Sequence, residues 1–162
     1  ITSVHENCMN YGGMSWKHTM ELVEAVPGMK LVFDTCNPVF NRDHSRDDKP
    51  WQDAWEFYQN VKEHISYIHV KDGLNPSPEN GNKEVYTYPG EGQGCVKEIM
   101  QDLKESGYEG GISIEPHLAA VFHDADSQNH TDEDPKDIYI RYGQKLMEIL
   151  SSIGYEHSPY QP

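Results

Sequence analysis

The sequence predicts an α/β fold in which parallel strands alternate with helices. A short β-rich run followed by an amphipathic helical pattern occurs four times along the chain. The β-rich runs are continuously apolar rather than cleanly alternating, which is typical of parallel strands that are buried on both faces. Four successive units of this kind indicate a parallel sheet whose strands are connected by right-handed crossovers.

The four predicted strands are short, and polar residues stand at or just beyond the end of each. They are Ile1–His5, Lys30–Asp34, Ile65–Val70 and Gly111–Glu115. Each helix that follows has apolar residues three or four positions apart, which places them on one helix face. The residues of these faces are Trp16, Met20 and Val23; Trp51, Trp55 and Tyr58; Val96, Ile99, Met100 and Leu103; and Leu146, Ile149, Leu150 and Ile153.

Turn residues separate the predicted elements. Pro27-Gly28 follows the first helix, Gly107 the third and Gly154 the fourth, while Asp134-Pro135 suits the start of the last helix. These turn residues lie at the ends of the segments with helical apolar spacing, so they support the predicted helix boundaries.

Two long loops, residues 71–93 and 116–134, follow strands rather than helices. They therefore lie at the carboxyl edge of the sheet, where α/β proteins build their sites. We expect residues 1–154 to form the folded part of the chain and residues 155–162 to form a flexible tail.

The chain is acidic, and this excludes some partners. Asp and Glu number 27 against 13 Lys and Arg, which gives a formal net charge of −14. A protein that binds nucleic acid by neutralising phosphates needs the opposite balance, so no nucleic-acid partner is expected. No apolar run approaches the ~18 residues of a membrane span, so no membrane association is expected. Cys8, Cys36 and Cys95 are an odd number without zinc-type spacing, which favours free thiols in the cytoplasm.

Four residues with metal-binding side chains stand at the carboxyl ends of the four predicted strands. They are Glu6, Asp34, His69 and Glu115. In a parallel sheet these ends lie side by side, so three carboxylates would converge and repel one another unless a cation neutralises them. Oxygen ligands with one imidazole suit Mn²⁺, Mg²⁺ or Co²⁺ better than a structural zinc ion. The sequence therefore predicts a divalent-metal site, with Mn²⁺ as the first choice.

Five segments together resemble one enzyme superfamily. They are His5-Glu6-Asn7, Phe33-Asp34-Thr35-Cys36-Asn37, His69-Val70-Lys71-Asp72, Pro89-Gly90-Glu91-Gly92 and Ile114-Glu115-Pro116-His117. The combination resembles the sugar phosphate isomerase/epimerase superfamily, the xylose-isomerase-like group of divalent-metal (β/α)₈ barrels. The resemblance extends to about Gly154.

The resemblance implies that the chain is the second half of a TIM-type barrel, strands five to eight. In that superfamily four metal ligands come from the ends of these strands, and they match Glu6, Asp34, His69 and Glu115. The chain has 162 residues, short of the ~250 of a closed barrel, and it begins with Ile1 rather than Met. We therefore expect an upstream half of the same barrel as a partner, an inactive or marginally folded chain in its absence, and a possible homo-oligomer.

The predicted chemistry is proton abstraction next to a carbonyl. A divalent ion that chelates a carbonyl and the neighbouring hydroxyl acidifies the C–H between them, and two carboxylates can then remove and return the proton. Glu6 and Glu115 are the candidates for this pair, as the resemblance to ketose epimerases also suggests. The leading hypothesis is a metal-dependent isomerase or epimerase acting on a sugar, sugar phosphate or polyol.

Further residues near the strand ends are candidates for substrate binding or ligand support. They are His5, Asn37, Lys71, Asp72 and His117. Lys71 either steadies negative charge on the substrate or forms an ion pair with Asp72. His5 alternates to the other side of its strand from Glu6. Ketose 3-epimerases typically have His and Arg at the places held here by Asn37 and by Lys71-Asp72, which weakens the assignment to free ketoses.

Other functions stay open at this point. The barrel subunit of a C-glycoside deglycosidase would use His5 or His117 as its base, and an inosose-dehydratase-like lyase would share the same metal site. A phosphodiester-cleaving endonuclease fits the acidic chain least well. A barrel relative that only binds sugar would not need all four ligands.

Overall fold

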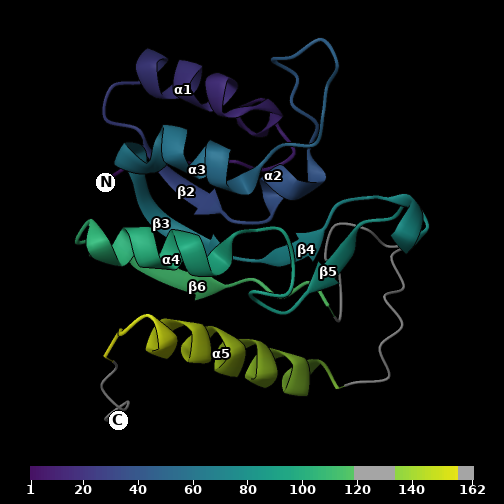
Figure 1. Cartoon of the computed structure of the whole chain (residues 1–162). Coiled ribbons are helices and arrows are strands. Elements are labelled where there is room, and N and C mark those ends of the chain that lie inside the picture. Colours follow the sequence, from purple (N-terminus) through teal and green to yellow (C-terminus); the bar gives the residue numbers. More distant parts are fainter. Residues whose placement is uncertain (119–133, 157–162) are drawn as a thin grey trace.

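The computed structural model describes residues 1–118 and 134–156 of the chain. Four strands form one parallel sheet in chain order: β1 (Val4–Glu6), β2 (Lys30–Asp34), β3 (Ile65–Val70) and β6 (Gly111–Ile114) (Figure 1). The predicted α/β class and the parallel order are thereby confirmed. The first strand begins at Val4 rather than Ile1, because only residues from Val4 onward pair with β2.

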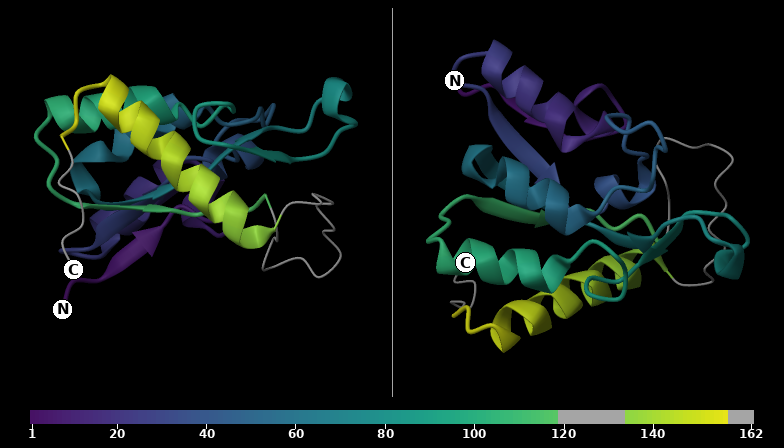
Figure 2. Two further views of the ribbon diagram at one scale, coloured as in Figure 1. Left: turned by 90° about the horizontal axis from the view of Figure 1, so that it is seen from below. Right: turned by 45° about the horizontal axis from the view of Figure 1, so that its top comes forward.

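Four main helices follow these strands and cover one face of the sheet (Figures 1 and 2). They are α1 (Trp16–Ala25), α3 (Ala54–Val61), α4 (Val96–Glu105) and α5 (Pro135–Ser152). Side chains cap three of them: Ser15 accepts from the amide of His18, Asp53 from that of Glu56, and Asp134 from that of Lys136. The remaining helical segments are short: α2 (Asn37–Phe40) and 3₁₀ turns at Gly12–Met14, Lys62–His64 and Pro78–Asn80.

The core lies between the sheet and these helices. Phe33 on β2 packs against Phe57 and Tyr58 of α3, with ring centroids 5.8 Å apart in both pairs. Ile68 of β3 and Ile99 of α4 are fully buried in the same cluster. The predicted apolar helix faces are therefore the faces that pack on the sheet, except at Trp51. That residue precedes α3, and its ring stacks under the guanidinium of Arg42 at 3.5 Å.

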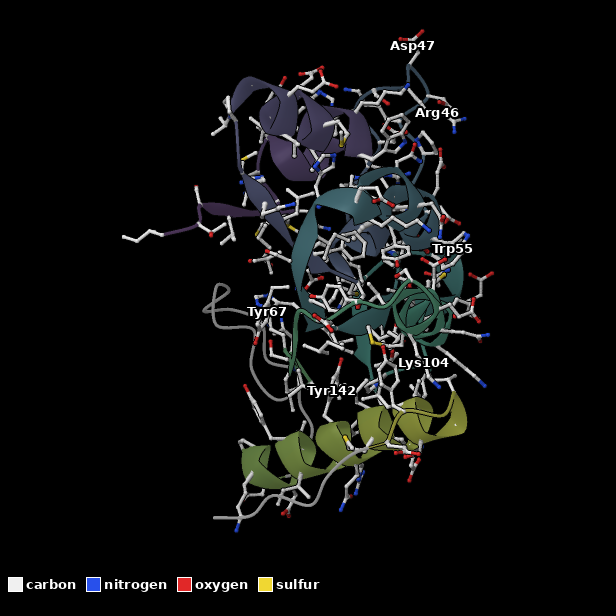
Figure 3. The ribbon with its side chains drawn as sticks, turned by 90° about the vertical axis from the view of Figure 1, so that its left-hand side faces the viewer. Arg46, Asp47, Trp55, Tyr67, Lys104 and Tyr142 are labelled. Carbon is white, nitrogen blue, oxygen red and sulfur yellow. The ribbon has the colours of Figure 1, made fainter. Side chains whose placement is uncertain are left out.

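The opposite face of the sheet is uncovered within the described part of the chain. Val4 is 50% exposed and Tyr67 37% exposed, and Figure 3 shows Tyr67 on the side of the sheet away from α4. The sequence predicted strands buried on both faces. Among residues 1–118 and 134–156 nothing packs on the second face, so only the helix face is buried there.

A bulge sets the alignment of the two central strands. Leu31 of β2 pairs with Ile65 of β3, but the next residue, Val32, pairs with Tyr67. The shift of one residue brings Asp34 level with His69 at the carboxyl end. Without it Asp34 would lie beside Ile68, whose side chain points to the other face.

The predicted loop at residues 71–93 contains a hairpin that the sequence analysis did not identify. Strand β4 (Asp72–Leu74) pairs antiparallel with β5 (Val85–Thr87). Tyr86 of β5 packs edge-on against Phe40 and against His117, with ring centroids 5.0 and 5.1 Å apart. The hairpin thus lies beyond the carboxyl ends of the sheet strands (Figure 1).

Asp72 holds the segment that follows this hairpin. Its carboxylate accepts hydrogen bonds from the amides of Gly73, Gly90, Gly92 and Gly94, at 2.8–3.0 Å. A side chain on Gly92 would come within 2.3 Å of that carboxylate, so the close approach requires glycine. Asp72 is fully buried. The sequence predicted that Asp72 contacts substrate or supports the ligands, and that stays a prediction. In the structure its carboxylate accepts from backbone amides and holds the loop.

We predict that Asp72→Asn destabilises the protein, because an amide accepts at only one of its two ends and cannot satisfy four amide donors. The free energy of unfolding should fall by about 3 kcal/mol, the size expected for losing hydrogen bonds to a buried charge. Urea denaturation followed by circular dichroism measures it, with the chain combined with the upstream half of the barrel that the sequence predicts. Glu91→Gln in the same loop is the control, since Glu91 forms an exposed ion pair with Lys145 at 3.4 Å and should lose less than about 1 kcal/mol. Equal stability of wild type and Asp72→Asn would contradict the role given to Asp72.

Candidate metal centre

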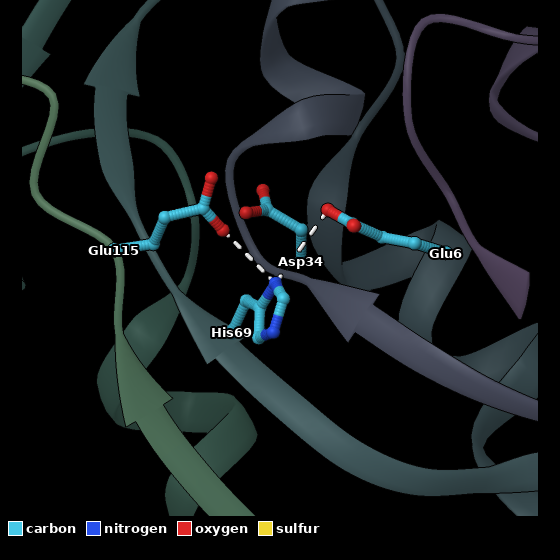
Figure 4. A group of neighbouring side chains, drawn as sticks. All are labelled: Glu6, Asp34, His69 and Glu115. Atoms are coloured by element: carbon cyan, nitrogen blue, oxygen red, sulfur yellow. Dashed lines mark ion pairs between the residues drawn. The ribbon is translucent and has the colours of Figure 1, made fainter. Parts of the chain in front are cut away.

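The four residues singled out at the strand ends lie together on the uncovered face of the sheet. Each of Glu6, Asp34, His69 and Glu115 offers one ligand atom, and these atoms all lie within 4.8 Å of one another. Figure 4 shows the four side chains converging on a common point. Glu6 and Asp34 are the last residues of β1 and β2, His69 is the penultimate residue of β3, and Glu115 directly follows β6.

Asp34 is the most buried member, and its two oxygens have different partners. Oδ1 accepts from the backbone amides of Cys36 and Asn37, at 2.9 and 2.7 Å. Oδ2 lies 3.0 Å from Nζ of Lys71. Burial raises the pKa of Asp34, and the Lys71 charge opposes this rise. Since Oδ1 is engaged by the backbone, Oδ2 is the oxygen available to the cluster.

His69 points its Nδ1 between the two glutamates. This nitrogen lies 2.9 Å from Oε2 of Glu115 and 3.6 Å from Oε1 of Glu6. The nearby carboxylate of Glu115, and then that of Glu6, raises the pKa of His69 to about 10, against the opposing effect of burial. Without a metal the ring is therefore an imidazolium, and its Nδ1 already faces the oxygens with which it would share an ion.

Glu115 has three positively charged or hydrogen-bonding neighbours. Its Oε1 lies 3.1 Å from Nε2 of His117 and 3.7 Å from Nζ of Lys71, while Oε2 faces His69. Burial raises the pKa of Glu115, but the neighbouring rings of His117 and His69 and the Lys71 charge outweigh it and hold the pKa well below its usual range. Glu115 is therefore a carboxylate, one oxygen of which faces the cluster.

The donor set fits a divalent cation. Three buried atoms, Asp34 Oδ2, His69 Nδ1 and Glu115 Oε2, have no partner with hydrogen-bond geometry within residues 1–118 and 134–156, although charged neighbours lie close to them. All three belong to the four-residue cluster. Buried polar atoms that lack partners are costly, and a shared cation would satisfy them together. Three carboxylates and one imidazole are the donors that Mg²⁺, Mn²⁺ or Co²⁺ accept.

The other predicted site residues divide into two groups. Asn37 and His117 touch the cluster: Nδ2 of Asn37 donates to Oε1 of Glu6 at 3.4 Å, and His117 contacts Glu115 as described. Lys71 also touches it, and its ion pair runs to Asp34 rather than to Asp72. His5 lies against Gly12, where an added side chain would come within 2.1 Å of Nε2 of the ring, and so it is outside the cluster.

Two supporting residues were missed by the sequence analysis. Asn7 holds the backbone of Asp34 at both ends: its Oδ1 accepts from the Asp34 amide at 2.7 Å, and its Nδ2 donates to the Asp34 carbonyl at 3.1 Å. Thr35 does the same for Lys71, because its Oγ1 accepts from the Lys71 amide at 3.1 Å and donates to the Lys71 carbonyl. Both are polar residues next to predicted ligands, and both lie inside the segments that carry the family resemblance; these are the signals that could have identified them.

A four-stranded parallel sheet with helices on one face and polar side chains gathered at its carboxyl edge has the architecture of half a (β/α)₈ barrel. The model of the xylose isomerase-like TIM barrel family matches residues 1–141. The chain therefore belongs to the xylose isomerase-like TIM barrel family. No curated protein matches the sequence significantly.

Solved structures with the same fold are about twice as long as this chain. A xylose isomerase-like TIM barrel protein from Mycobacterium smegmatis, in complex with magnesium, has a TM-score of 0.66 and 15% identity over 94% of this chain and 45% of that one. A xylose isomerase domain protein from Planctomyces limnophilus has a TM-score of 0.62 and 20% identity over 93% and 46%. The probable 3-DHS dehydratase AsbF from Bacillus anthracis has a TM-score of 0.54 and 15% identity over 96% and 50%.

The chain spans about half the length of these structures, and its fold is that of half a barrel. The family includes isomerases, epimerases and dehydratases. In the described ranges, none of the helices combines the length and apolar character needed to cross a membrane.

We predict that the protein binds one divalent ion and that Asp34→Asn abolishes most of this binding, because the substitution removes the negative charge on Oδ2. The dissociation constant for Mn²⁺ should rise at least about 100-fold, as when a ligand rather than a supporting residue is lost. Isothermal titration calorimetry measures it. Asp102→Asn is the control, since Asp102 pairs with Lys62 and Tyr58 away from the cluster. Equal affinity of wild type and Asp34→Asn would contradict the assignment of the site.

Proposed function

We propose that this protein forms the metal-binding half of an isomerase or epimerase that acts on a hydroxy-carbonyl compound of the sugar, sugar phosphate or polyol class. One observation carries the proposal: four ligand atoms from four successive strand ends lie within 4.8 Å of one another. Family membership supports it, because the family includes sugar isomerases and epimerases.

Glu6, Asp34, His69 and Glu115 would hold the ion, with Mn²⁺ as the proposed metal and Mg²⁺ or Co²⁺ as alternatives. When bound, such an ion supplies Lewis acidity to a carbonyl and a neighbouring hydroxyl, which makes the C–H bond between them acidic. As a ligand, His69 would be the neutral imidazole, because a ligating imidazole must be deprotonated.

Glu6 and Glu115 are the proposed proton-transfer residues. They come from β1 and from the end of β6, the two outer strands of the sheet, so they flank the cluster from opposite sides (Figure 4). Opposite placement lets one carboxylate remove a proton from one face of a carbon while the other returns a proton on the second face. Asn37 and His117 orient these two carboxylates through the contacts at 3.4 and 3.1 Å.

We predict that the enzyme exchanges a carbon-bound hydrogen of its substrate with solvent. With a panel of ketoses, inososes and 3-oxo-glycosides in ²H₂O, the substrate should gain deuterium next to its carbonyl, as read by mass spectrometry and NMR. Glu6→Gln and Glu115→Gln should each slow exchange at least about 100-fold, the usual contribution of a general acid or base. Metal content is measured in parallel, so that loss of the ion is separated from loss of the base.

Glu109→Gln is the matched control, since Glu109 is exposed in the turn before β6. Exchange at the wild-type rate in Glu6→Gln with full metal content would remove Glu6 from the mechanism. Absence of exchange with every compound of the panel would count against the isomerase proposal as a whole.

A lyase is the second candidate, and one observation favours it. His117 is a buried ring within hydrogen-bond distance of Glu115 and packed against Tyr86, which is a suitable place for a group that protonates a leaving group, the hydroxyl oxygen in a dehydratase or the aglycone carbon in a C-glycoside deglycosidase. A dehydratase or a C-glycoside deglycosidase would release water or aglycone after the same proton abstraction. The same panel separates the two, because elimination yields a shorter or unsaturated product whereas isomerisation keeps the composition.

We also propose that the working enzyme contains further βα units that complete the barrel. Two features support this. The uncovered face of the sheet, opposite the helices, exposes the side chains of Val4 and Tyr67. In the described part of the chain, β1 and β6 each pair with another strand on one side only. Unpaired strand edges associate with other chains, so a protein must cover them. The solved relatives are about twice as long.

We predict that the 162-residue chain expressed alone associates through these edges and lacks activity. Size-exclusion chromatography with light scattering should show oligomers or aggregates, and a hydrophobic dye should bind the open face. Co-expression with a complementary half-barrel should yield a defined complex that binds less dye. A monomeric, active 162-residue chain that binds no dye would refute this proposal.

A further inference from the structure

Lys71 is a buried cation inside the ligand cluster. Only 4% of its surface is exposed, which is rare for a lysine unless its charge is paired. Its Nζ lies 3.0 Å from Oδ2 of Asp34 and 3.7 Å from Oε1 of Glu115. Two of the four proposed metal ligands therefore share this ammonium.

The position of Lys71 is set by its backbone as well as by its charge. It follows β3 directly and lies two residues after His69. Oγ1 of Thr35 hydrogen-bonds both its amide and its carbonyl. Asp72, the next residue, is held by four glycine amides. The chain on both sides of Lys71 is thus anchored, and its side chain is not a mobile surface arm.

The charges of the cluster balance only when Lys71 is counted. Glu6, Asp34 and Glu115 contribute three negative charges, and Lys71 contributes one positive charge. A divalent ion would bring the total to zero. The ammonium and the ion would also compete for the same atom, because Oδ1 of Asp34 is engaged by two backbone amides and Oδ2 faces Lys71.

We propose that Lys71 is a built-in counter-cation of the metal centre, an inference that rests on the proposed metal site. It holds Asp34 and Glu115 in place before the metal arrives. It then weakens metal binding, because its positive charge repels the ion and shares Oδ2. Lys71 is therefore a positioning residue: it lowers the affinity for the metal but keeps the ligands in place before the metal binds. This role does not require contact with the substrate.

The test compares Lys71→Met and Lys71→Arg with wild type in the protein that carries the complete barrel. Lys71→Met keeps the length and removes the charge, so it should bind Mn²⁺ at least about tenfold more tightly, the order expected when a unit charge beside a divalent ion is removed. Without metal its melting temperature should fall below that of wild type, and saturating Mn²⁺ should restore it. Lys71→Arg keeps the charge and should retain the wild-type affinity to within about threefold.

Lys62→Met is the matched control, since Lys62 also pairs with an aspartate at 3.0 Å but lies away from the cluster. It should leave the Mn²⁺ affinity unchanged. Unchanged or weaker Mn²⁺ binding by Lys71→Met would overturn the proposal, and so would a Lys71→Met protein that stays unfolded in saturating Mn²⁺. Failure of the metal site itself is distinguishable, because wild type would then bind no Mn²⁺ at all.

Discussion

The convergence of three carboxylates at one edge of a parallel sheet is the constraint on which the rest of this structure depends. Strand order places Glu6, Asp34, His69 and Glu115 at four successive strand ends, and their ligand atoms lie within 4.8 Å of one another. Such a group of like charges is stable only with cations or donors around it. Lys71 and the imidazolium of His69 supply the cations, and the amides after Asp34 supply further donors. Without them the carboxylates would repel one another, and the carboxyl edge would not have a defined geometry.

Side-chain hydrogen bonds between neighbouring strands fix the backbone at the proposed ligands and at Lys71. Asn7 links β1 to the backbone of Asp34, and Thr35 links β2 to the backbone of Lys71. Each of these residues follows a ligand in the sequence and reaches across to the next strand. These hydrogen bonds therefore tie the end of β1 to that of β2, and the end of β2 to that of β3. Asp72 extends the same principle to the hairpin and the loop beyond it, where glycines allow four amides to approach one carboxylate.

The sequence was sufficient for the parts of the fold that depend on local periodicity. Continuous apolar runs and helical spacing identified four strand–helix units, and the polar residue after each run identified the cluster. Contacts that depend on strand register could not be found this way. A bulge between Leu31 and Val32 moves Asp34 level with His69, and no residue type in this segment predicts that bulge.

The ion-pair partner of Lys71 could not be predicted for the same reason. Asp72 is its neighbour in sequence but contacts the loop, whereas Asp34 is distant in sequence and lies 3.0 Å from its ammonium. The hairpin at β4 and β5 was hidden because short paired segments in a polar loop lack a periodic pattern.

All four proposed ligands and the residues that hold them lie between Glu6 and His117, on one half of the proposed barrel. The geometry of the proposed metal centre therefore comes from this half alone, whereas its environment would depend on the further units that we propose. His69 and Glu115 are each about one-third exposed at the side chain, and the inner face beside them is open at Tyr67. Electrostatic interactions strengthen as water is excluded, because the effective dielectric constant falls. A complementary set of strands would close this face and bring its own loops to the same edge. In the proposed enzyme, therefore, this half supplies the ligands and their charge balance, while the other half supplies enclosure and most of the contacts that select a substrate.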